Sequence, residues 1–210
     1  NTEGAYNTAL GRDALRYSTT ASNNTAVGFV ALSANITGAS NTAVGNSALS
    51  RNTTASNNTA VGYDSLDHNT TGANNVAVGY DALTANTTGT GNSAVGTFAL
   101  DKTTTGSFNT AFGYAALTQQ TATGSVYNTA MGYNAGSAVT TGTNNTLIGG
   151  LSGDATTTAS NNSALGFNSF SANTTGENNV ALGSYSLNQN TTAFNNTAVG
   201  HFALSANTTG

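Results

Sequence analysis

The chain has 210 residues but few charges, with four Lys or Arg, eight Asp or Glu and a net charge of −4. Its charged fraction of 6% compares with about a quarter in typical domains. Four scattered cations cannot neutralise a phosphate backbone, which argues against nucleic-acid binding. No run reaches the roughly 18 apolar residues of a membrane span. Because Cys is absent, disulfides and thiolate metal sites are excluded.

A five-residue phrase, Asn-Thr-Ala-Val-Gly or a close variant, recurs along the whole chain. Each copy begins 17 residues after the last, except for one step of 19 residues between Asn109 and Asn128. The asparagines that open the phrase are Asn7, Asn24, Asn41, Asn58, Asn75, Asn92, Asn109, Asn128, Asn145, Asn162, Asn179 and Asn196. A fixed period indicates one structural unit stacked on copies of itself. We therefore expect a single continuous array over residues 1–210, with its insertion at 119–127.

The residues within one repeat predict the elements in order, counting the opening Asn as position one. Positions two to four and seven to nine predict two short strands, and positions twelve to fifteen, Asn-Thr-Thr-Gly or similar, predict a polar turn. Position five is Gly in every copy, which requires either a positive φ or a close backbone approach. These turn glycines include Gly28, Gly45, Gly62, Gly79 and Gly96.

Two apolar positions are the candidate core. Position four is always apolar and position nine is nearly always Leu, with small residues at position eight. The predicted core residues include Val27, Leu32, Val44, Leu49, Val61, Leu66, Val78, Leu83, Val95 and Leu100. Frequent Gly argues against a helix, and no Asn-Gly hairpin signal occurs. The expected fold is therefore all-β, a parallel β-solenoid of about twelve 17-residue coils.

The apolar core of one coil is small for a free-standing chain. Two large side chains contribute about 3–6 kcal/mol when buried, whereas ordering each residue costs about 1–2 kcal/mol. Burial of these side chains against other chains would reduce the difference between the cost of ordering the coil and the free energy gained by burial. We therefore expect a homotrimer that shares an axial core of position-four and position-nine residues. Neither end carries an atypical capping repeat, so we also expect the array to be part of a longer fibre.

The repeat resembles those of phage tail fibres and of repeat-rich bacterial surface proteins. The resemblance rests on the segment from Asn58 to Leu66 and the Asn-Thr-Thr-Gly turn that follows it. The repeat is also similar, more distantly, to the heads of trimeric autotransporter adhesins, whose repeats are shorter. The resemblance covers the whole chain. It implies a trimeric extracellular fibre, at a cell surface or on a virion, that acts as a stalk or a binding surface.

Three surface features offer alternatives to a purely structural role. Aromatic residues at position six, among them Tyr63, Tyr80, Tyr114 and Tyr133, form either a glycan-binding stripe or a packing ladder, and we favour the ladder. Asparagines at positions one, twelve and seventeen either bind ligands or carry glycans or form hydrogen-bonded ladders, and again we favour ladders. The Thr pairs of the polar turn suggest ice binding, but adjacent strand residues point to opposite sides and leave one Thr per face.

Nothing in the repeat points to catalysis. Carboxylates do not recur in pairs, and no other His occurs at the repeat position of His68 or at that of His201. Calcium-binding loops would need more regularly spaced Asp residues than this chain has. We therefore expect no catalytic, metal or cofactor site. The expected function is a fibre segment that positions an adhesive or receptor-binding module.

Overall fold

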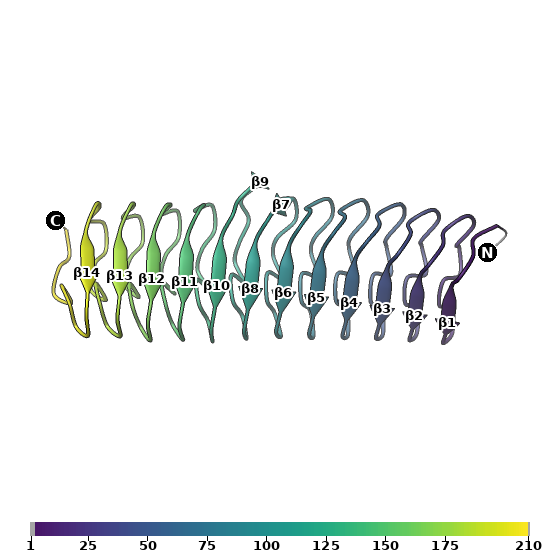
Figure 1. The fold of residues 1–210 in the computed structure, drawn as a ribbon, viewed down its shortest axis with the longest axis horizontal. Coiled ribbons are helices and arrows are strands. Elements are labelled where there is room, and N and C mark those ends of the chain that lie inside the picture. The colour runs from purple at the N-terminus through teal and green to yellow at the C-terminus, as the bar shows by residue number, and fades with distance from the viewer. Residues whose placement is uncertain (1–2, 210) are drawn as a thin grey trace.

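Residues 3–209, which the computed structural model describes, form one parallel β-solenoid with no helix (Figure 1). Twelve three-residue strands lie side by side in a single parallel sheet along the rod. The strands are β1 (Thr8–Leu10), β2 (Thr25–Val27), β3 (Thr42–Val44), β4 (Thr59–Val61), β5 (Val76–Val78), β6 (Ser93–Val95), β8 (Thr110–Phe112), β10 (Thr129–Met131), β11 (Thr146–Ile148), β12 (Ser163–Leu165), β13 (Val180–Leu182) and β14 (Thr197–Val199). The predicted all-β parallel β-solenoid is confirmed, while the homotrimer stays a prediction. Asn1, Thr2 and Gly210 of the predicted array lie outside the described residues.

The sheet register is the sequence repeat itself. In the β4–β5 pair, for example, Ala60 lies opposite Ala77 and Val61 opposite Val78. Every neighbouring pair follows this rule, so twelve strands give eleven coil-to-coil steps. Because strands in a sheet lie about 4.8 Å apart, the stack is roughly 55 Å long.

The two extra residues of the long repeat are accommodated at one corner of the coil. There β9 (Gly124–Ser125) pairs with β7 (Gly106–Ser107) in a separate two-stranded sheet, and the loop stands out from the rod (Figure 1). Gln120 occupies the place of the usual position-twelve Asn, and its Oε1 accepts a hydrogen bond from Asn128 Nδ2 at 2.7 Å. Val126 is fully buried beneath the loop. The interior of the solenoid therefore continues past the insertion.

The second predicted strand, at positions seven to nine, does not form. Positions seven and nine both have positive φ, as at Asp64 (49°) and Leu66 (54°), and this left-handed backbone is incompatible with a β-strand. The segment still bonds between coils, since Leu66 N–H donates to Ala82 O at 3.0 Å. The prediction was wrong because a stacked turn and a stacked strand share the same period.

The position-nine leucines form the core of the single chain. Leu32, Leu49, Leu66, Leu83 and Leu100 are all fully buried inside the coil. They pack with the position-three and position-eight residues, which are mostly alanines. Because each leucine is enclosed by its own chain, it is not available to an axial core shared between chains. This corrects the prediction that position nine contributes to such a core.

Position four points the other way. Val27, Val44, Val61, Val78 and Val95 are only partly buried. They lie on the outer face of the sheet, because successive strand residues point to opposite sides and position three points inward. They are therefore not part of the core of the single chain, and their place in a core shared between chains stays a prediction.

Two columns of buried asparagine complete the interior. At position one, each Asn Oδ1 accepts the backbone N–H of the next Asn in the column, as Asn58 does from Asn75 at 2.9 Å. At position twelve, side chains bond directly to one another, as Asn69 Nδ2 does to Asn52 Oδ1 at 2.9 Å. Both columns also donate to turn carbonyls, including Gly72 O. The favoured asparagine ladder is confirmed at these two positions, and it satisfies polar groups that no water reaches.

Position five needs Gly both because its φ is positive and because the neighbouring backbone approaches closely. Gly62 has φ of +139°, and a Cβ there would lie 2.3 Å from the carbonyl oxygen of Gly79. The same overlap recurs at Gly28, Gly45, Gly79 and Gly96. A side chain at this corner would force neighbouring coils apart, so only Gly fits.

Candidate functional site

Charge is concentrated on one side of the coil. Ten of the twelve charged residues, four basic and eight acidic in total, occupy positions six to eleven, and the other two are Glu3 and Glu177. None occurs at positions one to five. The solenoid therefore has chemically distinct sides, because each position forms a column along the rod.

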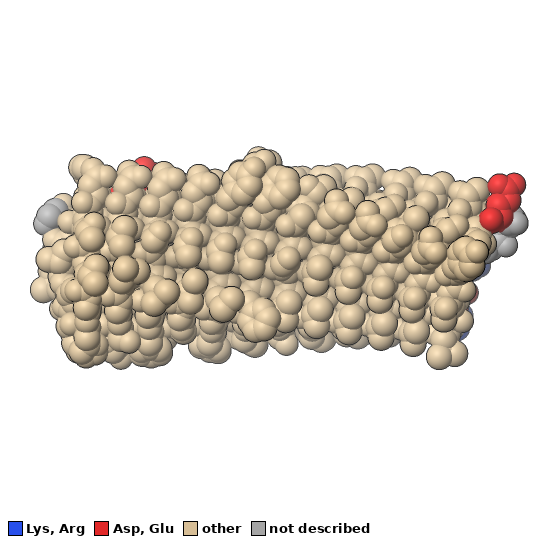
Figure 2. Space-filling view, viewed as in Figure 1, with Lys and Arg blue, Asp and Glu red and all other residues tan. Residues whose placement is uncertain are grey.

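The outer face of the sheet is one such side. Position two supplies mainly Thr, and position four supplies Val, Leu, Ile, Met or Phe. Several of these apolar side chains are exposed, including Phe112, Met131 and Leu165. Figure 2 shows this face with charged atoms only at its margins. An apolar band of this extent is unusual on a surface that meets only water.

Aromatic rings follow the corner beyond the turn glycine. Tyr63 and Tyr80 stack with centroids 5.3 Å apart, and Tyr114 and Tyr133 stack at 5.5 Å. Phe98 meets both Tyr80 and Tyr114 edge-on. About half of each tyrosine remains exposed, with values of 47, 47, 47 and 57% in chain order. The favoured packing ladder is present, yet these rings also stay accessible to a ligand.

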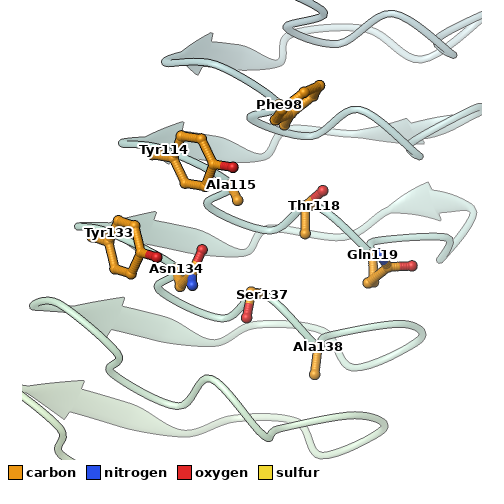
Figure 3. Close-up of a pocket in the computed structure, with 9 residues that line it drawn as sticks. All are labelled: Phe98, Tyr114, Ala115, Thr118, Gln119, Tyr133, Asn134, Ser137 and Ala138. Carbon is orange, nitrogen blue, oxygen red and sulfur yellow. The ribbon is translucent and has the colours of Figure 1, made fainter.

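An open groove lies beside the second tyrosine pair (Figure 3). Its floor consists of positions seven, ten and eleven from two successive coils, and Phe98 of the preceding coil lies at one end. The lining residues are Phe98, Tyr114, Ala115, Thr118, Gln119, Tyr133, Asn134, Ser137 and Ala138. The sequence analysis identified the two tyrosines but not the groove. The neutral residues at the floor positions, in contrast to Asp64 and Asp81 beside the first tyrosine pair, are the signal that could have revealed it.

The threonine pairs do not form a double exposed rank. The first Thr of a pair donates to the next coil, as Thr70 Oγ1 does to Thr87 O at 3.0 Å. The second, such as Thr71, is exposed. One column of exposed hydroxyls remains, as expected, although the reason is the hydrogen bond of the first Thr and not strand geometry, since the pairs lie outside the strands.

The position-twelve asparagines are closed to modification. Asn52, Asn69 and Asn86 each begin an Asn-Thr-Thr sequence, but all three are fully buried and hydrogen-bonded. The asparagines at position seventeen differ, since Asn57 is exposed and has φ of 62°. Asn tolerates this left-handed conformation better than most residues, which explains its frequency at this corner.

The carboxylates are spread along the charged side. Burial raises the pKa of Asp81, with further increases from Asp64 and Asp101. Burial also raises the pKa values of Asp101 and Asp154, against the lowering effect of hydrogen bonds and, at Asp101, of Lys102. Within residues 3–209, no group of three His, Cys, Asp or Glu side chains is placed to hold a metal ion. The same part of the chain has no helix that could cross a bilayer.

Comparisons with known proteins add no family. The chain matches no family model, and no curated protein or solved structure is significantly similar to it.

Proposed function

We propose that this chain is a structural segment of an extracellular fibre, on a cell surface or a virion, in which copies pack through the outer face of the sheet. The observation that carries the proposal is the continuous uncharged band of positions two and four along all twelve strands. A face that remained in water would be expected to carry some charge, as the opposite side of the same coil does. The resemblance to trimeric fibres sets the expected number of copies at three.

The dimensions of the band suit such a contact. Twelve strands about 4.8 Å apart and three residues wide give a surface of roughly 55 by 10 Å. Three such surfaces around one axis would bury on the order of 1,600 Å² in total, which is within the range of specific interfaces. Phe112, Met131 and Leu165, which are exposed in the single chain, would be covered.

The construction of the rod also suits a mechanical role. Backbone groups outside the strands bond to the adjacent coil along the axis, as at Asp64 N–H to Asn46 O and His68 N–H to Thr84 O. Extending the rod would therefore load many parallel hydrogen bonds together. A stalk that holds a binding module away from a surface needs this stiffness.

Sedimentation equilibrium tests the assembly. We expect three copies for the wild-type chain and dissociation for the double variant Val44→Lys/Val78→Lys, because two charges would be buried in the contact. The matched control is Thr54→Lys/Thr88→Lys, which puts the same charges at exposed sites in the same spans of the chain. A folded wild-type monomer at the highest soluble concentration would overturn the proposal. Equal dissociation of both double variants would contradict the proposal that the outer face of the sheet forms the contact between copies.

A further inference from the structure

The groove between Phe98, Tyr114 and Tyr133 has the features of a ligand site rather than of a packing corner. The tyrosines form one wall, and Figure 3 shows their hydroxyl groups directed toward the floor residues. Tyr114 and Tyr133 are nearly parallel, with 14° between their planes, while Phe98 stands at 83° to Tyr114. Because neighbouring rings hold each other, a ligand would meet a preorganised aromatic surface.

Polar side chains on the floor supply the second requirement. The side-chain amides of Gln119 and Asn134 make no hydrogen bond within the part of the chain that the structure describes, and each offers two donors and an acceptor. Thr118 differs, since its Oγ1 donates to Asp101 Oδ1 at 2.8 Å. Ser137 Oγ lies 3.5 Å from Asp154 O, a long and weak contact. Two amides are therefore available to hydroxyl groups of a ligand.

The charge of the groove limits the ligand class. None of the nine lining residues is charged. The neighbouring charges are Asp101 and Lys102, at positions ten and eleven of the preceding coil, and Asp154, at position ten of the following coil. An anionic ligand would find no cluster of cations, and a cationic ligand no cluster of carboxylates. The combination of aromatic walls, free amides and an uncharged lining favours a neutral molecule with both apolar C–H faces and many hydroxyl groups.

We propose that this groove binds a neutral saccharide chain, with sugar C–H faces against Tyr114 and Tyr133 and sugar hydroxyls on Gln119 and Asn134. The site goes beyond the proposed fibre role and does not depend on it. Positions six to eleven lie past the Gly corner from the outer face of the sheet, so the groove is open in one chain whether or not that face is covered.

The first tyrosine pair provides an internal control. Tyr63 and Tyr80 stack as closely as the second pair and are equally half-exposed. Their position-seven neighbours, however, are Asp64 and Asp81 instead of Ala115 and Asn134. Stacking and exposure are thus matched between the pairs, and the neutral floor is present only beside the second.

Calorimetric titration of the 210-residue chain with soluble glucose, mannose and galactose oligosaccharides tests the proposal. We expect at least one of these to bind and Tyr133→Ala to weaken it about tenfold, the effect of losing one ring contact. Gln119→Ala, an exposed position chosen to preserve folding, should weaken binding severalfold. Tyr133→Phe retains the ring and should keep most of the affinity, and Tyr63→Ala should leave it unchanged.

Three results would overturn the saccharide site. One is that no neutral oligosaccharide binds, and another is that Tyr63→Ala weakens binding as much as Tyr133→Ala. The third is tighter binding of an acidic oligosaccharide such as oligogalacturonate. Thermal unfolding of each variant separates loss of the site from loss of the fold.

Discussion

Leu66 shows how backbone conformation selects residues in this repeat. Its φ is +54°, and the other position-nine leucines share this left-handed conformation. β-branched side chains are strongly disfavoured there, and position nine indeed holds Leu, Phe or Gly but never Val or Ile. Position four, within the strand, accepts Val and Ile freely. The two apolar columns therefore differ in composition because their backbones differ.

Val30 violates this rule and gives the first prediction. It occupies position seven with φ of 50°, where other coils place Asn, Asp, Ser, Ala, Leu, Phe or Tyr, none of which is β-branched. Val30→Asn should raise the free energy of unfolding by about 1 kcal/mol, because Asn tolerates the left-handed region. Chemical denaturation measures the change. The same substitution at Val27, in β2, should instead destabilise the chain, and a loss of stability at both sites would contradict the explanation.

Leu147 fills space that its neighbours leave empty. It replaces the usual position-three Ala, whereas Gly136 and Gly153 replace the usual position-nine Leu. A Cβ at Gly136 would lie 2.8 Å from Leu147 Cδ1, and one at Gly153 would lie 2.7 Å from Leu147 Cδ2. One leucine from the sheet side thus occupies the volume that leucines from the opposite side fill in other coils.

A rescue experiment follows from this exchange. Leu147→Ala should cost about 2–5 kcal/mol because it leaves a cavity, and Gly153→Leu alone should overpack the core. The double variant restores the ordinary Ala and Leu arrangement, so it should recover most of the lost stability. Thermal or denaturant unfolding of the three variants measures the coupling. Strictly additive losses would show that the two sites do not share one volume.

At the scale of the element, the position-twelve ladder of asparagines ends at Asn86 and resumes only at Asn173. It first runs through Asn35, Asn52, Asn69 and Asn86, but Thr103 follows. Thr103 Oγ1 donates to Gln120 O, and Asn86 Oδ1 is left buried without a hydrogen-bond partner. A buried acceptor without a partner costs about 1–3 kcal/mol.

Extending the ladder should recover this cost. In Thr103→Asn, the new Nδ2 is expected to donate to Asn86 Oδ1 in the same register as the preceding steps. We predict a gain of about 1 kcal/mol in the free energy of unfolding, measured by denaturant unfolding. Thr88→Asn, at an exposed position, is the control and should have little effect. No gain from Thr103→Asn would mean that the lost contact with Gln120 O outweighs the new bond.

At the scale of the whole molecule, the charged side makes stability depend on pH. Asp81, Asp101 and Asp154 have pKa values raised above the ordinary 3.8, in each case mainly by burial. In the pH range above 3.8, the folded chain therefore binds more protons than the unfolded chain at these sites. The unfolding free energy then falls as pH rises through this range, and acidification from neutrality toward 3.8 should stabilise the fold.

The pH prediction can be checked with thermal melts over that range. The melting temperature of the wild-type chain should rise on acidification. The double variant Asp101→Asn/Asp154→Asn should show a smaller rise, because two of the responsible carboxyl groups are gone. A wild-type melting temperature that falls steadily on acidification from neutrality toward pH 3.8 would contradict the burial of these groups.

Much of the fold could be predicted from the sequence because the repeat period determines which residues stack on one another. The 17-residue spacing predicted the stack, and the invariant Gly predicted the tight corner. Asn predicted the ladders at positions one and twelve, but the ladder expected at position seventeen was wrong, since Asn57 is exposed there. The strand at positions seven to nine was wrong, because periodicity reports that coils repeat but not which φ they repeat. Tyr114 and Tyr133 of the candidate site were named from the sequence, which favoured a packing ladder over ligand binding for them. The floor residues Gln119 and Asn134 were not named, because they come together only through stacking.

The sequence by itself therefore determined that identical positions form columns, and which of those columns are apolar, polar, charged or restricted to glycine. Only the tertiary structure decided which columns face inward. A Thr-Ala-Val strand can bury either its Ala or its Thr and Val, and the coil is too narrow for a second large residue opposite Leu66. The interior thus takes Ala60, and Val61 is left on the outer face. Leu147 opposite Gly153 is the exception that shows the same limit on volume.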